Sequence, residues 1–172
     1  MNIKETVMHR FEDNPIITPS NMPKGYAMME CGQTMYDGKY TLLVPIQRTD
    51  KVSPAIYVAE SEDGEHFKFG AEPLITPSKK YKELDKYISR PSVSYVPEDD
   101  MYYITRPLSK NSWGRAQLLS RTRDFKTVEE MGIMALPHNA SSCIFQGKIN
   151  GRYERIDRPD SNPFKTSRWI SF

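Results

Sequence analysis

The pattern that most restricts the fold of this chain is a β-hairpin sequence that occurs three times. In its clearest copy, residues 87–106, apolar and small polar residues alternate, an acidic run from Glu98 to Asp100 interrupts them, and β-branched and aromatic residues then resume. The pattern returns in residues 29–46, which turn at Asp37-Gly38, and in residues 141–159, which turn at Asn150-Gly151. Both dipeptides accept positive φ and are strong hairpin signals.

A second pair of strand patterns follows each of the first two hairpins, in residues 55–69 and 116–132. The motif Ser61-x-Asp63-Gly64 in the first aligns with Thr122-x-Asp124-Phe125 in the second. Two successive hairpins form a four-stranded antiparallel sheet, and repeats of about 50 to 60 residues built this way are typical of a β-propeller.

The predicted fold is therefore all-β: a single, partial β-propeller domain over residues 1–172, with blades of four antiparallel strands. Its repeats are expected at about residues 29–72, 88–132 and 141–172, so that the chain carries about two and a half blades. The third repeat stops inside its expected third strand. A charged connection between the first two repeats has room for a short helix around Lys79 to Asp85.

The composition agrees with a turn-rich β protein and excludes some functions. Thirteen prolines and nine glycines are spread along the chain, which argues against long helices. A net charge of only +2 gives no footprint for nucleic acid or an anionic membrane. No apolar run approaches the roughly 20 residues of a spanning helix, and no signal peptide is visible, so a cytoplasmic protein is expected.

The residues that most often bind metals are scattered. His9, His66 and His138 are far apart in sequence, so no metal site is predicted. Cys31 and Cys143 fall in the first strands of the first and third repeats, where small buried side chains are expected.

Several motifs in succession resemble glycoside hydrolase family 130. They are RFEDNPIITP, DGKYTLLV, AESEDGEHF, YYIT, TRDFKTVEEMG and FQGKINGRYERIDRP. Members of this family are five-bladed propellers that phosphorolyse or hydrolyse β-mannosides, and the resemblance runs from Arg10 onward and matches an N-terminal half. It implies a glycosidase or glycoside phosphorylase of carbohydrate metabolism, with an oligosaccharide or mannoside ligand. It implies no cofactor, and inorganic phosphate is a candidate co-substrate.

The position of the family's catalytic acid differs in this chain. An inverting mechanism needs a carboxylic acid that protonates the departing sugar oxygen. The family uses an aspartate in a Glu-Asp-Pro-Arg motif, whereas this sequence reads Ser89-Arg90-Pro91-Ser92. Arginine stays protonated and cannot act as a general acid near neutral pH. Arg90 is therefore expected to bind substrate.

The family's phosphate-binding set is only partly present. Lys148 and Arg158 match its lysine and arginine, so both are predicted to bind substrate or phosphate. The histidine expected before that arginine is Asp157, and Glu130 stands where the family has a further arginine. A carboxylate near phosphate would repel it.

Two carboxylates are candidates to replace the missing acid. Glu30, in the first strand of the first repeat, and Asp157, in the third repeat, would face each other across a propeller channel as acid and base. The alternative is that they form ion pairs with Arg90 and Arg158 and line the channel. Trp113, in a loop beside a glycine, is a candidate sugar platform at the pocket rim.

Three hypotheses of function remain open. In the first, the chain is an enzyme with altered site chemistry, hydrolytic rather than phosphorolytic because the anion-binding set is depleted. In the second, it is a non-catalytic sugar-binding propeller. In the third, it is a partial family chain that assembles with another chain. An incomplete blade exposes strand edges and apolar faces, which favours a homo-oligomer or a partner chain that completes the propeller.

Overall fold

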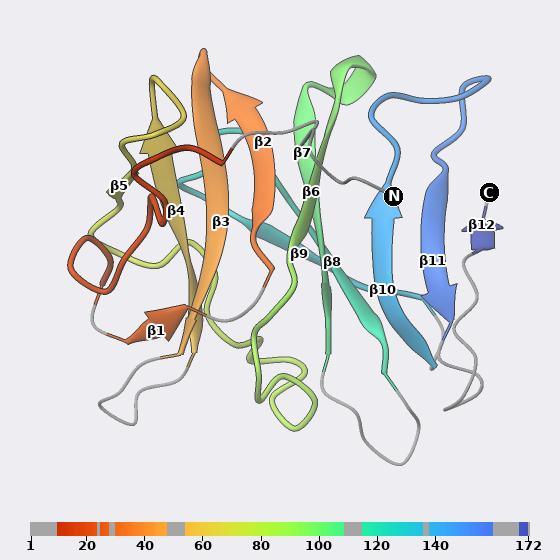
Figure 1. The fold of residues 1–172 in the computed structure, drawn as a ribbon. Coiled ribbons are helices and arrows are strands. Elements are labelled where there is room, and N and C mark those ends of the chain that lie inside the picture. The colour runs from red at the N-terminus through yellow and green to blue at the C-terminus, as the bar shows by residue number, and fades with distance from the viewer. Residues whose placement is uncertain are drawn as a thin grey trace, which may run out of the picture.

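The structure is a computed structural model that describes residues 10–23, 25–27, 30–47, 54–108, 115–135, 138–159 and 169–171. Within these ranges the chain forms three antiparallel sheets, which lie side by side in Figure 1. The first sheet contains β1 (Tyr26–Ala27), β2 (Gly32–Tyr36), β3 (Lys39–Gln47), β4 (Ala55–Ser61) and β5 (Lys68–Phe69). The second contains β6 (Ser92–Val96), β7 (Met101–Pro107), β8 (Gln117–Thr122) and β9 (Glu129–Ala135). The third contains β10 (Asn139–Ile144), β11 (Arg155–Pro159) and β12 (Trp169–Ser171).

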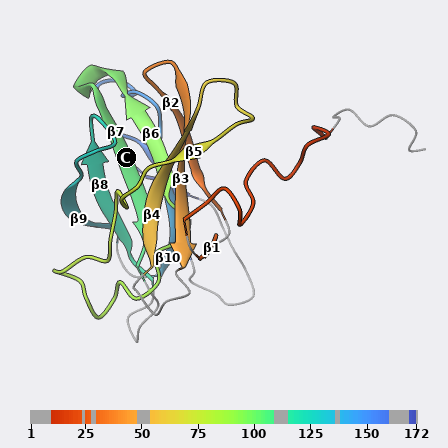
Figure 2. The same ribbon diagram turned by 90° about the vertical axis from the view of Figure 1, so that its left-hand side faces the viewer.

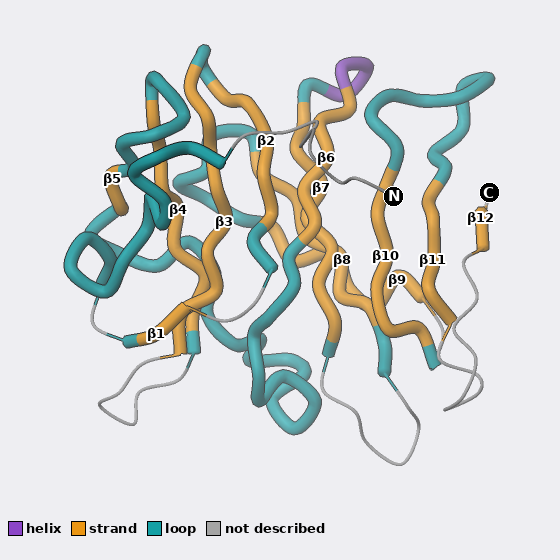
Figure 3. The backbone as a smooth tube through the Cα atoms, viewed as in Figure 1, coloured by secondary structure: helices purple, strands orange, loops and turns teal. Residues whose placement is uncertain are grey.

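The all-β prediction and the four-stranded antiparallel unit are confirmed. The second sheet has the order β6-β7-β8-β9, and the first has β2-β3-β4-β5 with β1 added beside the end of β3. Figure 3 shows that loops connect the strands and that the short 3-10 turn η1 (Pro97–Asp99) lies at the tip of the β6-β7 hairpin. The helix expected around Lys79 to Asp85 is absent: these residues form turns, because the hydrogen bonds of Leu84 and Asp85 to Tyr81 are not continued.

The turn dipeptides have the backbone that their residue types allow. Asp37 and Gly38 have φ of 49° and 73°, and Asn150 and Gly151 have φ of 51° and 76°. Two consecutive left-handed residues are the signature of a type I′ hairpin turn, whose twist matches that of the strands. The local sequence alone thus sets these two hairpins.

The motif shared by the first two repeats builds the same turn twice. In the first sheet, Asp63 Oδ1 accepts hydrogen bonds from the backbone N–H groups of Glu65 and His66, both at 2.8 Å. In the second sheet, Asp124 Oδ1 accepts from the backbone of the two residues that follow Phe125, at 2.8 and 2.9 Å. An aspartate that bonds its own backbone further along the chain fixes the turn that joins the third and fourth strands.

Apolar side chains hold neighbouring sheets together. Leu43 and Ile56 of the first sheet and Ile104 of the second are fully buried in one cluster between them. Val96, Tyr103 and Ile144 form the corresponding cluster between the second and third sheets. Ile16 and Ile17 of the N-terminal segment pack against a cluster on the first sheet. Figure 2 shows this segment beside β3. Burial of these faces stabilises the stack of sheets.

The first two sheets approach each other closely where β2 begins. A Cβ atom at Gly32 would lie 3.0 Å from the backbone oxygen of Pro91. Only glycine fits at this distance, because any side chain would push the two sheets apart. The approach brings the residues just before β2 and β6 together, at the position of the candidate site.

Candidate functional site

A cavity of about 460 Å³ lies where the first strands of the three sheets meet. Its walls come from residues 30–33 of the first sheet, 90–93 of the second, and 141–143 and 156–158 of the third. Four residues predicted from the sequence, Glu30, Arg90, Asp157 and Arg158, line this one cavity. The repeat architecture thus gathers polar groups that are more than one hundred residues apart.

Glu30 and Arg90 form an ion pair at the cavity. The distance between Arg90 Nε and Glu30 Oε2 is 3.1 Å. Both residues have left-handed backbone, with φ of 70° and 49°, which is uncommon for residues other than glycine. Such backbone strain is concentrated at functional sites, where surrounding structure holds it. The pairing that the sequence offered as an alternative to catalysis is therefore present for Glu30.

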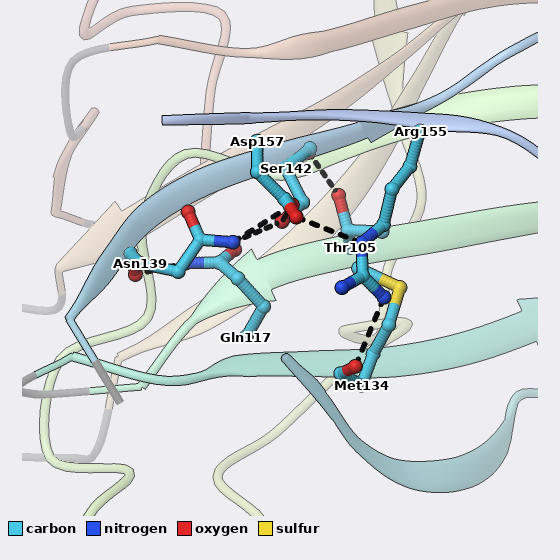
Figure 4. A network of polar contacts seen from close by, with 7 residues as sticks. All are labelled: Thr105, Gln117, Met134, Asn139, Ser142, Arg155 and Asp157. Atoms are coloured by element: carbon cyan, nitrogen blue, oxygen red, sulfur yellow. Dashed lines mark hydrogen bonds and ion pairs between the residues drawn. The ribbon is translucent and has the colours of Figure 1, made fainter. Parts of the chain in front are cut away.

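Asp157 is buried in the cavity wall and is held by three side chains (Figure 4). Its Oδ1 accepts hydrogen bonds from Asn139 Nδ2 at 2.7 Å and Ser142 Oγ at 2.5 Å, and its Oδ2 accepts from Arg155 Nε at 2.9 Å. Ser142 stands directly opposite Asp157 in the β10-β11 ladder. Arg155, two residues away on the same strand, is thus an ion-pair partner of Asp157. The pairing with Arg158 that the sequence offered stays a prediction.

Arg158 is partly buried in the same wall. Its Nε is buried and has no hydrogen-bond partner among the described residues. A buried donor without an acceptor costs free energy, so a position of this kind in a cavity is suited to an acceptor on a ligand. A guanidinium binds carboxylate and phosphate groups through charge-assisted hydrogen bonds.

The two cysteines were expected to be buried, and that expectation is wrong. Cys31 and Cys143 are free, exposed thiols that line the cavity. Cys31 directly precedes β2 and Cys143 lies on β10, and both side chains line the opening between the sheets instead of the core. Desolvation raises the pKa of the Cys31 thiol, so it stays protonated at neutral pH.

Lys148 does not lie in this cavity. Its Nζ binds Asp99 Oδ1 at 2.7 Å, and its backbone N–H donates to Glu98 at 2.9 Å, at the tip of the β6-β7 hairpin. Asp99 also accepts hydrogen bonds from the hydroxyls of Tyr103 and Tyr153. Glu98 and Asp99 of the acidic run thus form a contact between the β6-β7 hairpin and the β10-β11 hairpin. The phosphate-binding role of Lys148 stays a prediction that this placement does not support.

We expect Asp99→Asn to destabilise the chain in a pH-dependent way. Hydrogen bonds from Lys148, Tyr153 and Tyr103 lower the pKa of Asp99 from 3.8 to about 2. A depressed pKa stabilises the fold above about pH 4, and this contribution is lost as the pH falls toward 2. The melting temperature of the variant should lie below that of the wild type at pH 7, and the two should converge near pH 2.

Asp100→Asn is the matched control for this measurement. Asp100 lies next in sequence, but its side chain is 68% exposed and its ion pair with Arg123 is long, at 3.6 Å. Exposed pairs contribute little, so this variant should melt within a few degrees of the wild type at every pH. If the melting temperatures of the two variants changed with pH in the same way, ionised Asp99 would not be the group that stabilises the fold.

Two further residues from the sequence analysis lie elsewhere. Trp113 falls outside the described residues. Glu130 lies on β9, accepts a hydrogen bond from Ser78 at 3.0 Å, and does not line the cavity, so it does not repel an anion there.

Several residues that complete the site had no role assigned from the sequence pattern. Gln33, Ser92, Ser141 and Ser142 line the cavity, and Asn139 holds Asp157 from behind. The strand-pairing register would have indicated Ser142, since residues opposite in a hairpin share a face. Nothing in the local sequence distinguishes Asn139.

A group of possible metal ligands lies away from the cavity. In the described part of the chain, Asp63, Glu65 and His66 place one ligand atom each within 4.8 Å of one another. All three are exposed, and Asp63 is engaged in the turn described above. We assign no metal to them. Among the described residues there is also no helix with the length and apolar character needed to cross a membrane.

Among known proteins, this chain is similar in sequence to two mannoside phosphorylases. No protein-family model matches the chain. It is 32% identical over 104 residues to the β-1,2-mannobiose phosphorylase of Listeria innocua, covering 60% of this chain and 28% of that protein. It is 24% identical over 162 residues to the β-1,4-mannooligosaccharide phosphorylase of Ruminococcus albus, covering 91% and 48%. The chain thus spans less than half the length of these curated relatives.

Solved structures show the same fold. The Listeria innocua enzyme in complex with β-1,2-mannobiose superimposes with a TM-score of 0.77 at 22% identity, over 94% of this chain and 61% of that one. A structure from the GH130 family, described as glycoside hydrolases that target β-1,2-mannosidic linkages in Candida mannan, gives 0.66 at 19% identity, over 91% and 56%. The resemblance to glycoside hydrolase family 130 is confirmed, and the chain covers part of that family's propeller-type fold.

Proposed function

We propose that the chain, as part of the family 130 fold, binds a β-mannoside in the cavity between its three sheets without cleaving it by the family's usual acid. The observation that carries this proposal is the composition of one cavity. Glu30, Arg90, Asp157 and Arg158 converge there with serine hydroxyls and an amide. A few convergent polar groups in a concave site are what orients a polar ligand such as a sugar.

The absence of turnover by the usual route follows from position 90. Arg90 stands where the resemblance places an aspartate, and its guanidinium is paired with Glu30. An arginine has no proton to give at neutral pH. In addition, Lys148 is bound to Asp99 outside the cavity, and among the described cavity residues Arg158 has a buried donor without a partner.

A second candidate function is cleavage with Glu30 and Asp157 as the acid and base. The observation that favours it is that both carboxylates line the same cavity and come from different sheets, the first and the third. Two carboxyl groups on opposite sides of a glycosidic bond are the requirement for inverting hydrolysis. In this reading water replaces phosphate as the nucleophile, and Arg90 holds Glu30 in place.

The experiment that separates these functions combines binding with product analysis. Isothermal titration calorimetry with β-1,2- and β-1,4-mannobiose measures affinity, and release of mannose and mannose 1-phosphate is followed with and without inorganic phosphate. Binding without release supports the proposal. Phosphate-independent release that Glu30→Gln abolishes supports hydrolysis. Phosphate-dependent release would overturn both readings, and absence of binding would overturn the first.

Assembly is a separate proposal. Ile156 of the third sheet is 38% exposed, and Met35 of the first sheet is 47% exposed. Uncovered sheet faces favour association with further sheets, supplied by another copy or by a partner chain. Light scattering that shows a stable, folded monomer at micromolar concentration would contradict this.

A further inference from the structure

Asp157 is the end of a network of buried polar side chains that begins in the second sheet (Figure 4). Gln117 of β8 donates to the backbone oxygen of Asn139 at 2.9 Å, and Thr105 of β7 donates to the backbone oxygen of Ser142 at 2.5 Å. Asn139 and Ser142 then both donate to Asp157 Oδ1. The second sheet thus fixes the two residues that hold this carboxylate.

The Arg155 side chain completes the arrangement from the other side. Its Nε binds Asp157 Oδ2, and its terminal nitrogen donates to the backbone oxygen of Met134 on β9 at 3.0 Å. Both carboxylate oxygens are therefore tied to groups that are themselves tied to the second sheet. A carboxylate held in this way has one orientation toward the cavity, because any rotation would break charge-assisted hydrogen bonds.

The network contains two buried amides, of which Asn139 donates to the carboxylate and Gln117 donates to the backbone of Asn139. Asn139 turns its nitrogen toward Asp157 and Ser142, and its carbonyl oxygen Oδ1 has no hydrogen-bond partner within the described ranges. Gln117 likewise donates through Nε2, and its Oε1 has no partner in the same part of the chain. Leaving buried acceptors unpaired opposes stability. Retaining two of them beside one cavity residue is typical of a site that favours ligand binding over stability.

We propose that Asn139 is a positioning residue that holds Asp157 as a fixed hydrogen-bond acceptor for hydroxyl groups of the mannoside. This inference rests on the proposed function, and it adds that Asn139, through Asp157, determines how the mannoside is recognised. A fixed carboxylate accepts from sugar hydroxyls without losing side-chain freedom on binding, which favours affinity. Its neighbour Arg158 also lines the cavity and carries only donor groups. The cavity thus contains an acceptor and a donor for sugar hydroxyls.

The test is a double-mutant cycle read by mannobiose affinity. Asn139→Ala should raise the dissociation constant for the mannobiose that the wild type binds by about tenfold, which corresponds to the loss of one charge-assisted hydrogen bond. Asp157→Asn should weaken it at least as much. In the Asp157→Asn background, Asn139→Ala should change affinity less than twofold, because Asn139 acts only through Asp157. Additive losses, or an unchanged dissociation constant for Asn139→Ala, would overturn the inference.

Ser94→Ala is the matched control. Ser94 also donates a hydrogen bond from the second sheet to the third, to the backbone oxygen of Ile144 at 2.5 Å, but it does not contact Asp157. It should lower the melting temperature and leave affinity unchanged. If Asn139→Ala does not fold, Asn139→Leu keeps a similar volume without the amide. Loss of affinity in Ser94→Ala equal to that of the Asn139 variant would indicate a merely structural role.

A failure of the proposed function is recognised separately. If the wild type binds neither mannobiose, that function fails, and the side-chain amide protons of Asn139 then report on the network by nuclear magnetic resonance. Protected protons that become exposed to exchange in Asp157→Asn support positioning. Protons that exchange freely in the wild type overturn it.

Discussion

Replacing Asp85 by alanine is expected to lower the free energy of unfolding by about 3–5 kcal/mol, because it leaves a buried arginine without its counter-ion. Asp85, in the connection between the first two sheets, is 1% exposed, and Arg106 on β7 is 2% exposed. The Arg106 guanidinium donates to both carboxylate oxygens, at 2.5 and 2.6 Å. The Ser78 N–H also donates to Asp85 at 2.5 Å. Chemical denaturation followed by fluorescence measures the loss.

The double variant Asp85→Leu with Arg106→Met is the control for this prediction. Removing both charges eliminates the unpaired ion, and replacement of a buried pair by apolar side chains is often neutral. The variant should therefore regain most of the stability, with a remaining deficit of about 1 kcal/mol from the Ser78 N–H. If the double variant is as unstable as Asp85→Ala, the unpaired charge of Arg106 is not the cause of the loss of stability.

Replacing Arg158 by methionine is expected to weaken the binding of inorganic phosphate by at least about 2 kcal/mol, a factor of about 30. Methionine keeps much of the apolar stem and removes every donor. Arg158 Nε is buried and unpaired in the cavity wall, so its hydrogen bond to an anion would be made in a desolvated place. Titration calorimetry with phosphate, with and without mannobiose, gives the change in affinity.

Arg90→Met is the matched comparison for this substitution. Both arginines line the cavity, but Arg90 is already paired with Glu30, and its side chain is 31% exposed. A partly exposed, paired cation contributes less to a ligand, so this variant should lose less than about 1 kcal/mol of phosphate affinity. A larger loss for Arg90→Met than for Arg158→Met would reverse the assignment of the anion site.

The hairpins of this protein were predictable because each rests on residues close in sequence. Asp37-Gly38 and Asn150-Gly151 form the left-handed turns that those residue types allow, and the aspartates of the two repeat motifs bond their own backbone nearby. Alternation of apolar and polar residues then gave the strand faces. The connection that had room for a short helix at residues 79–85 forms turns instead, and its last residue, Asp85, is held by Arg106 of the second sheet.

The placement of the site was only partly accessible from sequence. Glu30, Arg90, Asp157 and Arg158 line one cavity because the repeats put equivalent positions at its centre. Lys148 was placed in the pocket by its motif, whereas the structure pairs it with Asp99.

The sequence by itself determined the turns, the strand alternation and the repeat, since these depend on backbone preferences within a few residues. Only the tertiary structure decided which charges meet. The partners of Asp157, Asp85 and Lys148 follow from how the sheets pack, and Arg155 and Asn139 became visible through that packing. Long-range pairing depends on the twist and spacing of whole sheets, which no local pattern records.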